Sequence, residues 1–274
     1  MNGAMSLSEA FLRALVDELA GKQTVAIILA GSHAQDDATP YSDVDMAHIV
    51  AAPLSGPDKQ YYYREGHLVS VATRPLSWFR AAVTRPEHAV LYVAGLRGAR
   101  ILLDREGAFH AFQQELENFS WAPLQEAANS YASSAMLHLV ELAHKVLSAL
   151  VRGDRLCLFE AASGLWYALT QVVTVQRGVL VVSSHTHMRQ VREAVGMDAP
   201  WTRYHGLVAE SDVQGARAIS VEARAIAVLC LYQETVALQR SVIRPEHREI
   251  AEQTVVTIEA ALPQLRSISD RLEP

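Results

Sequence analysis

The sequence predicts an α+β protein in which a mixed sheet in the N-terminal half is followed by a bundle of helices. Up to about residue 118, short β-branched apolar runs alternate with amphipathic stretches. From about residue 119 onward, apolar residues recur at helical spacing and few strand signals remain. The 274 residues suffice for two modest domains. We predict a mixed-sheet domain over residues 1–118 and a helical bundle over residues 119–274.

The first predicted element is an amphipathic helix over residues 6–21, whose N-terminus Ser6 or Ser8 can cap. The run TVAIILAG then predicts a buried strand that ends at Gly31. Two strands, two helices and one more strand are predicted next, at residues 43–50, 64–75, 76–86, 87–96 and 99–104.

The second half is rich in long alanine- and leucine-containing stretches with helical periodicity. The first predicted helix covers residues 129–154 and stops near Gly153. Further helices are predicted at residues 155–178, 185–196, 220–242 and 246–269. A proline in a helix interior removes a hydrogen bond, so we expect Pro263 to interrupt the last one. The pattern favours a helical bundle.

The overall composition limits the classes of partner. A formal net charge of −6 and a pI near 6.0 argue against a nucleic-acid backbone as the main partner. The two cysteines, Cys157 and Cys230, lack metal-like spacing. With no basic segment followed by an apolar core at the N-terminus, and no apolar run near the length of a bilayer span, we expect a cytoplasmic protein that binds no membrane.

A pair of aspartates stands inside the predicted strand DVDMAHIV. Burying two adjacent carboxylates without a partner is costly, so we expect a positively charged group or ion next to them. Strand alternation puts Asp43 and Asp45 on one face and Val44 on the other. Two such carboxylates make a hard oxygen-ligand site suited to Mg²⁺.

A small-residue turn precedes this pair. Gly31 and Ser32 follow a predicted strand and open a helical turn, where free amides and the serine hydroxyl can hold phosphate oxygens. A turn that binds phosphate next to carboxylates that bind a metal ion is the combination that phosphoryl or nucleotidyl transfer requires.

The whole segment GSHAQDDATPYSDVDM, residues 31–46, resembles the signature of the nucleotidyltransferase superfamily that includes DNA polymerase beta. The PYSDVDM ending and the helical second half resemble the family of kanamycin nucleotidyltransferase and related antibiotic adenylyltransferases. The resemblance implies Mg²⁺ bound by Asp43 and Asp45, and a nucleoside triphosphate held by Gly31 and Ser32. It also implies ATP as co-substrate, an aminoglycoside-like or other small hydroxylated acceptor, and a possible homodimer.

The narrower resemblance extends to VELAHK in the first long helix. By this resemblance, Glu141 is the candidate general base for the acceptor hydroxyl and Lys145 the candidate phosphate contact. Residues four apart share a helix face, so both could point into one cleft. The same Glu–Lys spacing is also a common stabilising pair on a solvent-exposed helix.

The sequence departs from this family at one position. The family places a third carboxylate on the next strand, where this sequence has Ser70; Glu65 and His67 lie nearby. Three interpretations are open: one well-held metal with Glu141 as base, another side chain that completes the site, or a non-catalytic nucleotide-binding protein with a regulatory role. A fourth keeps the chemistry but takes a protein hydroxyl as acceptor, as in AMPylation of the toxin–antitoxin type.

Overall fold

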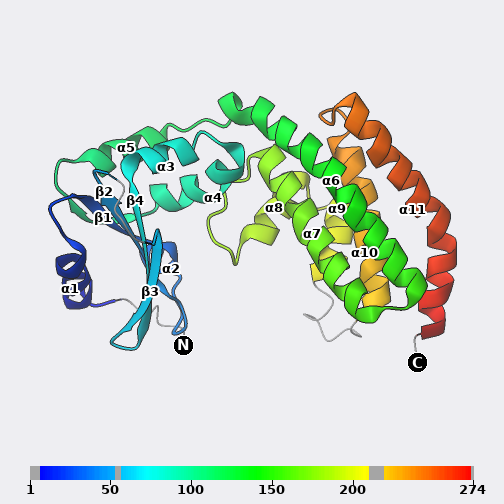
Figure 1. Ribbon diagram of the computed structural model, residues 1–274, viewed down its shortest axis with the longest axis horizontal. Coiled ribbons are helices and arrows are strands. Elements are labelled where there is room, and N and C mark those ends of the chain that lie inside the picture. Colours follow the sequence, from blue (N-terminus) through cyan, green and yellow to red (C-terminus); the bar gives the residue numbers. More distant parts are fainter. Residues whose placement is uncertain (1–6, 53–56, 210–218, 273–274) are drawn as a thin grey trace. The chain divides into compact units, whose positions relative to one another are not determined.

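The computed structural model describes residues 7–52, 57–209 and 219–272, with side chains described up to residue 265. These residues divide into two compact units, each labelled by its elements in Figure 1. The first comprises Met1–Pro123 with Leu180–Thr186, and the second Leu124–Val179 with His187–Pro274. A mixed sheet followed by many helices confirms the predicted α+β class.

The first unit contains one five-stranded sheet in the order β3-β4-β2-β1-β5. Strands β2 and β4 pair in parallel, and the other neighbouring pairs are antiparallel. Its elements in chain order are α1 (Glu9–Leu19), β1 (Thr24–Ala30), α2 (Gly31–Ala34), β2 (Val44–Val50), β3 (Lys59–Arg64), β4 (His67–Pro75), α3 (Leu76–Ala82), α4 (Pro86–Arg97), β5 (Arg100–Asp104) and α5 (Ala108–Glu117).

Strand β3 was not predicted, and the single strand predicted over residues 64–75 is in fact the second arm of a hairpin. Its two-residue turn is Glu65–Gly66, with positive φ at both residues. The sequence hid β3 because it is an edge strand whose residues are mostly exposed, so no apolar alternation marks it. Helix α5 was also not predicted.

One face of the sheet is covered by α1 (Figure 1). Ser8 caps this helix by accepting a hydrogen bond from the Phe11 amide at 3.1 Å, while Ser6 lies outside the described residues. The apolar residues of α1 pack against alternate residues of the strands, and the cluster comprises Phe11, Leu12, Leu15, Ile27, Leu29, Val44, Met46, Val69 and Val71. The intervening strand residues therefore face the opposite side.

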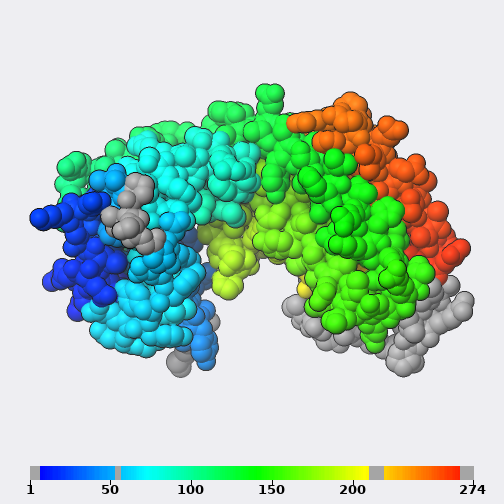
Figure 2. All heavy atoms as spheres, in the orientation of Figure 1, coloured from blue at the N-terminus to red at the C-terminus, as the bar shows by residue number. Residues whose placement is uncertain are grey.

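On that opposite side, a segment far along the chain joins the first unit. Residues Leu180–Thr186 follow α7 in sequence, yet the Val181 amide donates a hydrogen bond to the Val90 carbonyl of α4 at 2.7 Å. The side chain of Gln35 donates to the Val182 carbonyl at 3.4 Å. Figure 2 shows this segment in yellow-green at the surface beside α4.

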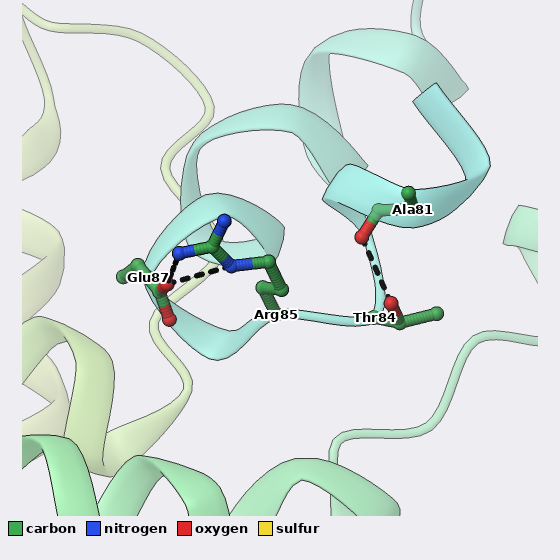
Figure 3. Close-up of polar contacts among 4 residues, drawn as sticks. All are labelled: Ala81, Thr84, Arg85 and Glu87. Atoms are coloured by element: carbon green, nitrogen blue, oxygen red, sulfur yellow. Dashed lines mark hydrogen bonds and ion pairs between the residues drawn. The ribbon is translucent and has the colours of Figure 1, made fainter. Parts of the chain in front are cut away.

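The corner between α3 and α4 fixes where α4 begins (Figure 3). Thr84 donates its hydroxyl to the Ala81 carbonyl at 2.8 Å, and Arg85 donates to one carboxylate oxygen of Glu87 at 2.6 and 3.0 Å. Burial alone would raise the pKa of Glu87, but hydrogen bonds from its own backbone amide and from Arg85 lower it below its ordinary value. Pro86 occupies the first helical turn, where a missing amide costs nothing.

In the second unit, every regular element among the described residues is a helix. Its elements are α6 (Gln125–Arg152), α7 (Arg155–Arg177), α8 (His187–Val195), α9 (Pro200–Ala209), α10 (Val221–Gln239) and α11 (Pro245–Leu272). Gly153 at φ +67° ends α6, and Asp154 caps α7 by accepting from the Cys157 amide at 3.1 Å.

The expected interruption at Pro263 was wrong, because α11 continues through it. Ile258 before the proline is fully buried and Leu265 after it is nearly so. Burial of these side chains on both sides offsets the one backbone hydrogen bond that the proline removes.

Helices α6 and α7 give the second unit its core. By length and composition alone, the spans Ala122–Arg152 and Arg155–Arg177 are apolar enough to cross a bilayer, a test that core helices of globular proteins also pass. Here they pack against each other and against α10 through buried residues such as Leu147, Leu165 and Val228. Their apolar faces are thus used inside the bundle.

Substitution of Leu165 by alanine should lower the free energy of unfolding by about 2–5 kcal/mol, because it removes a fully buried side chain and leaves a cavity. Chemical denaturation followed by circular dichroism measures this. Leu156→Ala on the same helix is the matched control: this leucine is 71% exposed, so the change should stay within about 0.5 kcal/mol. Equal losses in the two variants would contradict the assigned core.

Candidate functional site

The two aspartates stand where β2 begins, on the face of the sheet away from α1. Asp43 directly precedes the strand, Asp45 is its second residue, and both line one cavity. Between them, Val44 is fully buried in the core beneath the sheet. The strand therefore anchors itself with its apolar side chains and presents its carboxylates to the cavity.

The turn after β1 lies directly against this pair. Ala30 pairs with Asp45, so Gly31 follows at the level of the carboxylate. Gly31 has φ +65°, and a Cβ atom added there would lie 2.6 Å from Asp45 Oδ2. Only glycine combines this left-handed conformation with such a close approach. Ser32 follows it in the one-turn helix α2 and also lines the cavity.

Asp45 occupies an electrostatically strained position. Burial raises its pKa above the ordinary value of 3.8, and the charge of Asp43 raises it further. A hydrogen bond from Ser70 and the positive fields of Lys59 and His33 act in the opposite direction without cancelling the rise. The site is thus short of positive charge, as expected for two neighbouring carboxylates.

Ser70 occupies the place on β4 where the resembling family carries its third carboxylate. It pairs in register with Asp45 on the adjacent strand, is 1% exposed, and donates its hydroxyl to the Asp45 carboxylate. Glu65 cannot take over this role, because it lies at the exposed tip of the β3–β4 hairpin with φ +49°. Among the residues that the structure describes, no three His, Cys, Asp or Glu side chains gather into a metal-binding group.

Lys59 is the site residue that the sequence analysis missed. It begins β3, where it pairs with Ala72 of β4, and it lines the same cavity as the aspartates. A hydrogen bond with Tyr61 raises the pKa of Lys59, and after a smaller opposing effect of burial the charges of Tyr61, Asp45 and Asp43 raise it further. The only sequence signal for Lys59 was its spacing of two residues from Tyr61, which puts both on one face of a strand. Because no strand was predicted there, this spacing could not be interpreted.

The cavity above the sheet has a volume of about 630 Å³, within the range of small-molecule sites. Small or aliphatic side chains form its floor, and helix α4 and the segment Leu180–Thr186 form its walls. The residues that the floor and walls contribute include Ile28, Ala47, Ala72, Leu91, Tyr92, Leu96, Val181, Val182 and His185.

Glu141 and Lys145, the other two predicted site residues, lie on α6 in the second unit. Their side chains are 79% and 58% exposed, and Lys145 Nζ lies 3.2 Å from Glu141 Oε1. They share a helix face, as their spacing predicts, and they form an ion pair with each other. The first unit builds its cavity from its own residues.

The donor set at the aspartates fits one Mg²⁺ ion. Two carboxylates are the usual protein share of a magnesium site, in which substrate phosphates and water supply the remaining oxygen ligands. The close contact between Gly31 and Asp45 keeps the backbone amides of the turn near these carboxylates. A cation placed there would also relieve the repulsion that raises the pKa of Asp45.

Comparison with known protein families finds no matching family model, and no curated protein sequence is similar. Among solved structures, the chain is similar to a nucleotidyltransferase-like protein from Exiguobacterium sibiricum 255-15. The TM-score is 0.47 at 15% identity, over 94% of this chain and 89% of that one. The function proposed below is argued from the residues of the site.

Gly31→Ala should destabilise the protein by about 1–2 kcal/mol through its left-handed backbone conformation, and should push the Asp45 side chain out of position. Thermal unfolding measures the loss. Gly21→Ala is the matched control, since no atom lies within 4 Å of its added Cβ. Equal melting temperatures for the two variants would contradict the tight turn.

Asp45→Asn should make the protein more stable at neutral pH. The folded-state pKa is raised, so the native state binds this proton more tightly than the unfolded chain does, and its carboxylate opposes folding as pH rises through that pKa. The gain in melting temperature should shrink as pH falls through the raised folded-state pKa, and it should be gone below 3.8, the ordinary value. Asp17→Asn, at an exposed position on α1, is the control, and a less stable Asp45→Asn at neutral pH would contradict this account.

Proposed function

We propose that the protein is a nucleotidyltransferase that moves a nucleoside monophosphate from a magnesium-bound triphosphate to a hydroxyl of a small acceptor. The observation that carries the proposal is the close approach of Gly31 to Asp45, which joins the first turn of α2 to a pair of carboxylates in the lining of one cavity. One part suits phosphate and the other a divalent cation.

In this proposal each residue has a defined task. Asp43 and Asp45 hold Mg²⁺, which when bound would neutralise phosphate charge as the reaction proceeds. The amides of Gly31 and Ser32, with the Ser32 hydroxyl, donate hydrogen bonds to phosphate oxygens. Lys59, which lines the same cavity, adds a positive charge. The cavity volume of about 630 Å³ lies within the range of small-molecule sites.

The bond changes follow from this arrangement. The acceptor hydroxyl gives up its proton and its oxygen bonds to the α-phosphorus, while the bond from that phosphorus to the β-phosphate bridging oxygen breaks. Pyrophosphate and a nucleoside monophosphate ester are the products. Glu141 is the proposed general base and Lys145 the proposed phosphate contact, reaching the nucleotide from α6 of the same chain or of a second copy. Support for these two roles comes from the sequence resemblance and from their shared helix face.

The finer details are part of the proposal. We propose ATP as the nucleotide and an aminoglycoside-like acceptor by resemblance; the net charge of −6 is compatible with a cationic acceptor. The cavity of about 630 Å³ favours a small acceptor over a protein hydroxyl.

A second candidate is a nucleotide-binding protein without turnover, favoured by the neutral Ser70 beside Asp45. Calorimetric titration of ATP with Mg²⁺, combined with pyrophosphate release across a panel of hydroxylated acceptors, separates the two. We expect binding that Asp45→Asn abolishes, and pyrophosphate release with at least one small acceptor. Tight binding without release from any acceptor would favour the second candidate, and release only with a protein acceptor would favour AMPylation.

Glu141→Gln should lower the rate of pyrophosphate release by about 10²–10⁴-fold while the affinity for ATP changes little, because the variant loses the proton acceptor but no nucleotide contact. Initial rates and calorimetric affinities measure the two effects separately. Glu160→Gln, an exposed position on α7, is the matched control and should behave as the unmodified protein. An undiminished rate in Glu141→Gln would remove this residue from the mechanism.

A further inference from the structure

We infer that Lys59 supplies the positive charge that a second divalent ion would supply in a three-carboxylate site, so that this protein binds a nucleoside triphosphate with one divalent ion. The inference rests on the proposed function, which it makes more specific. It is carried by two features of the cavity: a serine in register with Asp45, and a lysine from the edge strand that lines the same cavity and lies within the electrostatic reach of both aspartates.

The donors in the cavity are too few for two ions. Two-metal sites hold a pair of cations about 3.5–4 Å apart and need bridging as well as separate ligands. Here Asp43 and Asp45 are the only carboxylates among the described residues that line the cavity. Ser70 donates its hydroxyl hydrogen to Asp45. Because the serine is neutral, it cannot balance the charge of a second cation.

The sheet register places the lysine one strand away from the strand of the aspartates. Lys59 pairs with Ala72, and Ala72 pairs with Ala47 on β2, so only methyl groups lie between the lysine and the strand of the aspartates. The long side chain can extend over this low floor. Tyr61 contacts this side chain. Lys59 Nζ lies 4.9 Å from the centre of the Tyr61 ring, and the two side chains share a hydrogen bond.

The net charge of a two-ion site with three carboxylates equals that of the one-ion site proposed here. Three carboxylates with two divalent ions carry one net positive charge. Two carboxylates, one ammonium and one divalent ion also carry one net positive charge. A serine at position 70 and a lysine at position 59 therefore give the same net charge to the site that a triphosphate meets, although a lysine cannot bridge oxygens as a metal ion does.

The test counts bound ions directly and does not require turnover. Electron paramagnetic resonance of free Mn²⁺, in the presence of the α,β-methylene analogue of ATP, gives the number of ions per chain. We expect one for the unmodified protein, and one with at least about tenfold weaker analogue binding for Lys59→Met, which loses a charged contact to phosphate. Lys59→Arg should keep most of the affinity. Lys22→Met, at an exposed position outside the cavity, should keep all of it.

A gain-of-site variant makes the test stricter. Combining Ser70→Asp with Lys59→Met restores a third carboxylate and removes the ammonium, so this variant should bind two Mn²⁺ ions with the analogue. Circular dichroism verifies that each variant is folded. Two ions on the unmodified protein, or unchanged analogue affinity in Lys59→Met, would overturn the inference.

The result also separates this inference from the function on which it rests. One Mn²⁺ bound with the analogue but no pyrophosphate from any acceptor would contradict the transferase and leave the role of Lys59 standing. Two ions bound, with pyrophosphate release, would contradict the role of Lys59 alone. A protein that binds neither Mn²⁺ nor the analogue would overturn both.

Discussion

The repulsion between Asp43 and Asp45, held next to each other at a partly buried strand end, is the constraint to which the rest of the first unit responds. Burial and mutual charge raise the pKa of Asp45, so the native state bears an energetic cost for keeping both groups ionised. The strand tolerates this cost because its other face is firmly anchored by Val44 and Met46 in the core below. A site that is costly without a ligand is well prepared to bind a cation.

The surrounding elements reduce this cost in different ways. Ser70 donates a hydrogen bond to the Asp45 carboxylate, and Lys59 and His33 act on it through their positive fields. None of the three neutralises the pair completely. The remaining negative charge lies beside a cavity whose floor is made of small side chains, and for this reason we propose a cation together with phosphate as the ligand.

The second unit relates to this site through the chain itself. The segment Leu180–Thr186 lies between α7 and α8 in the sequence but belongs to the first unit. There a backbone hydrogen bond to Val90 holds it as a wall of the cavity. The two units are therefore linked by three chain crossings. A wall contributed by the helical half of the sequence gives that half a direct part in the choice of what the cavity accepts.

The sequence by itself determined the features that depend on neighbours along the chain. Helical periodicity, the strand before Gly31, and the alternation of Asp43, Val44 and Asp45 are local, and each is present in the structure. The tertiary structure alone decided what pairs across strands: Ser70 beside Asp45, Lys59 in the same cavity, and residues 180–186 in its wall. Strand β3 showed no apolar alternation, because an exposed edge strand needs none, and a contact between distant residues exists only once the register is set.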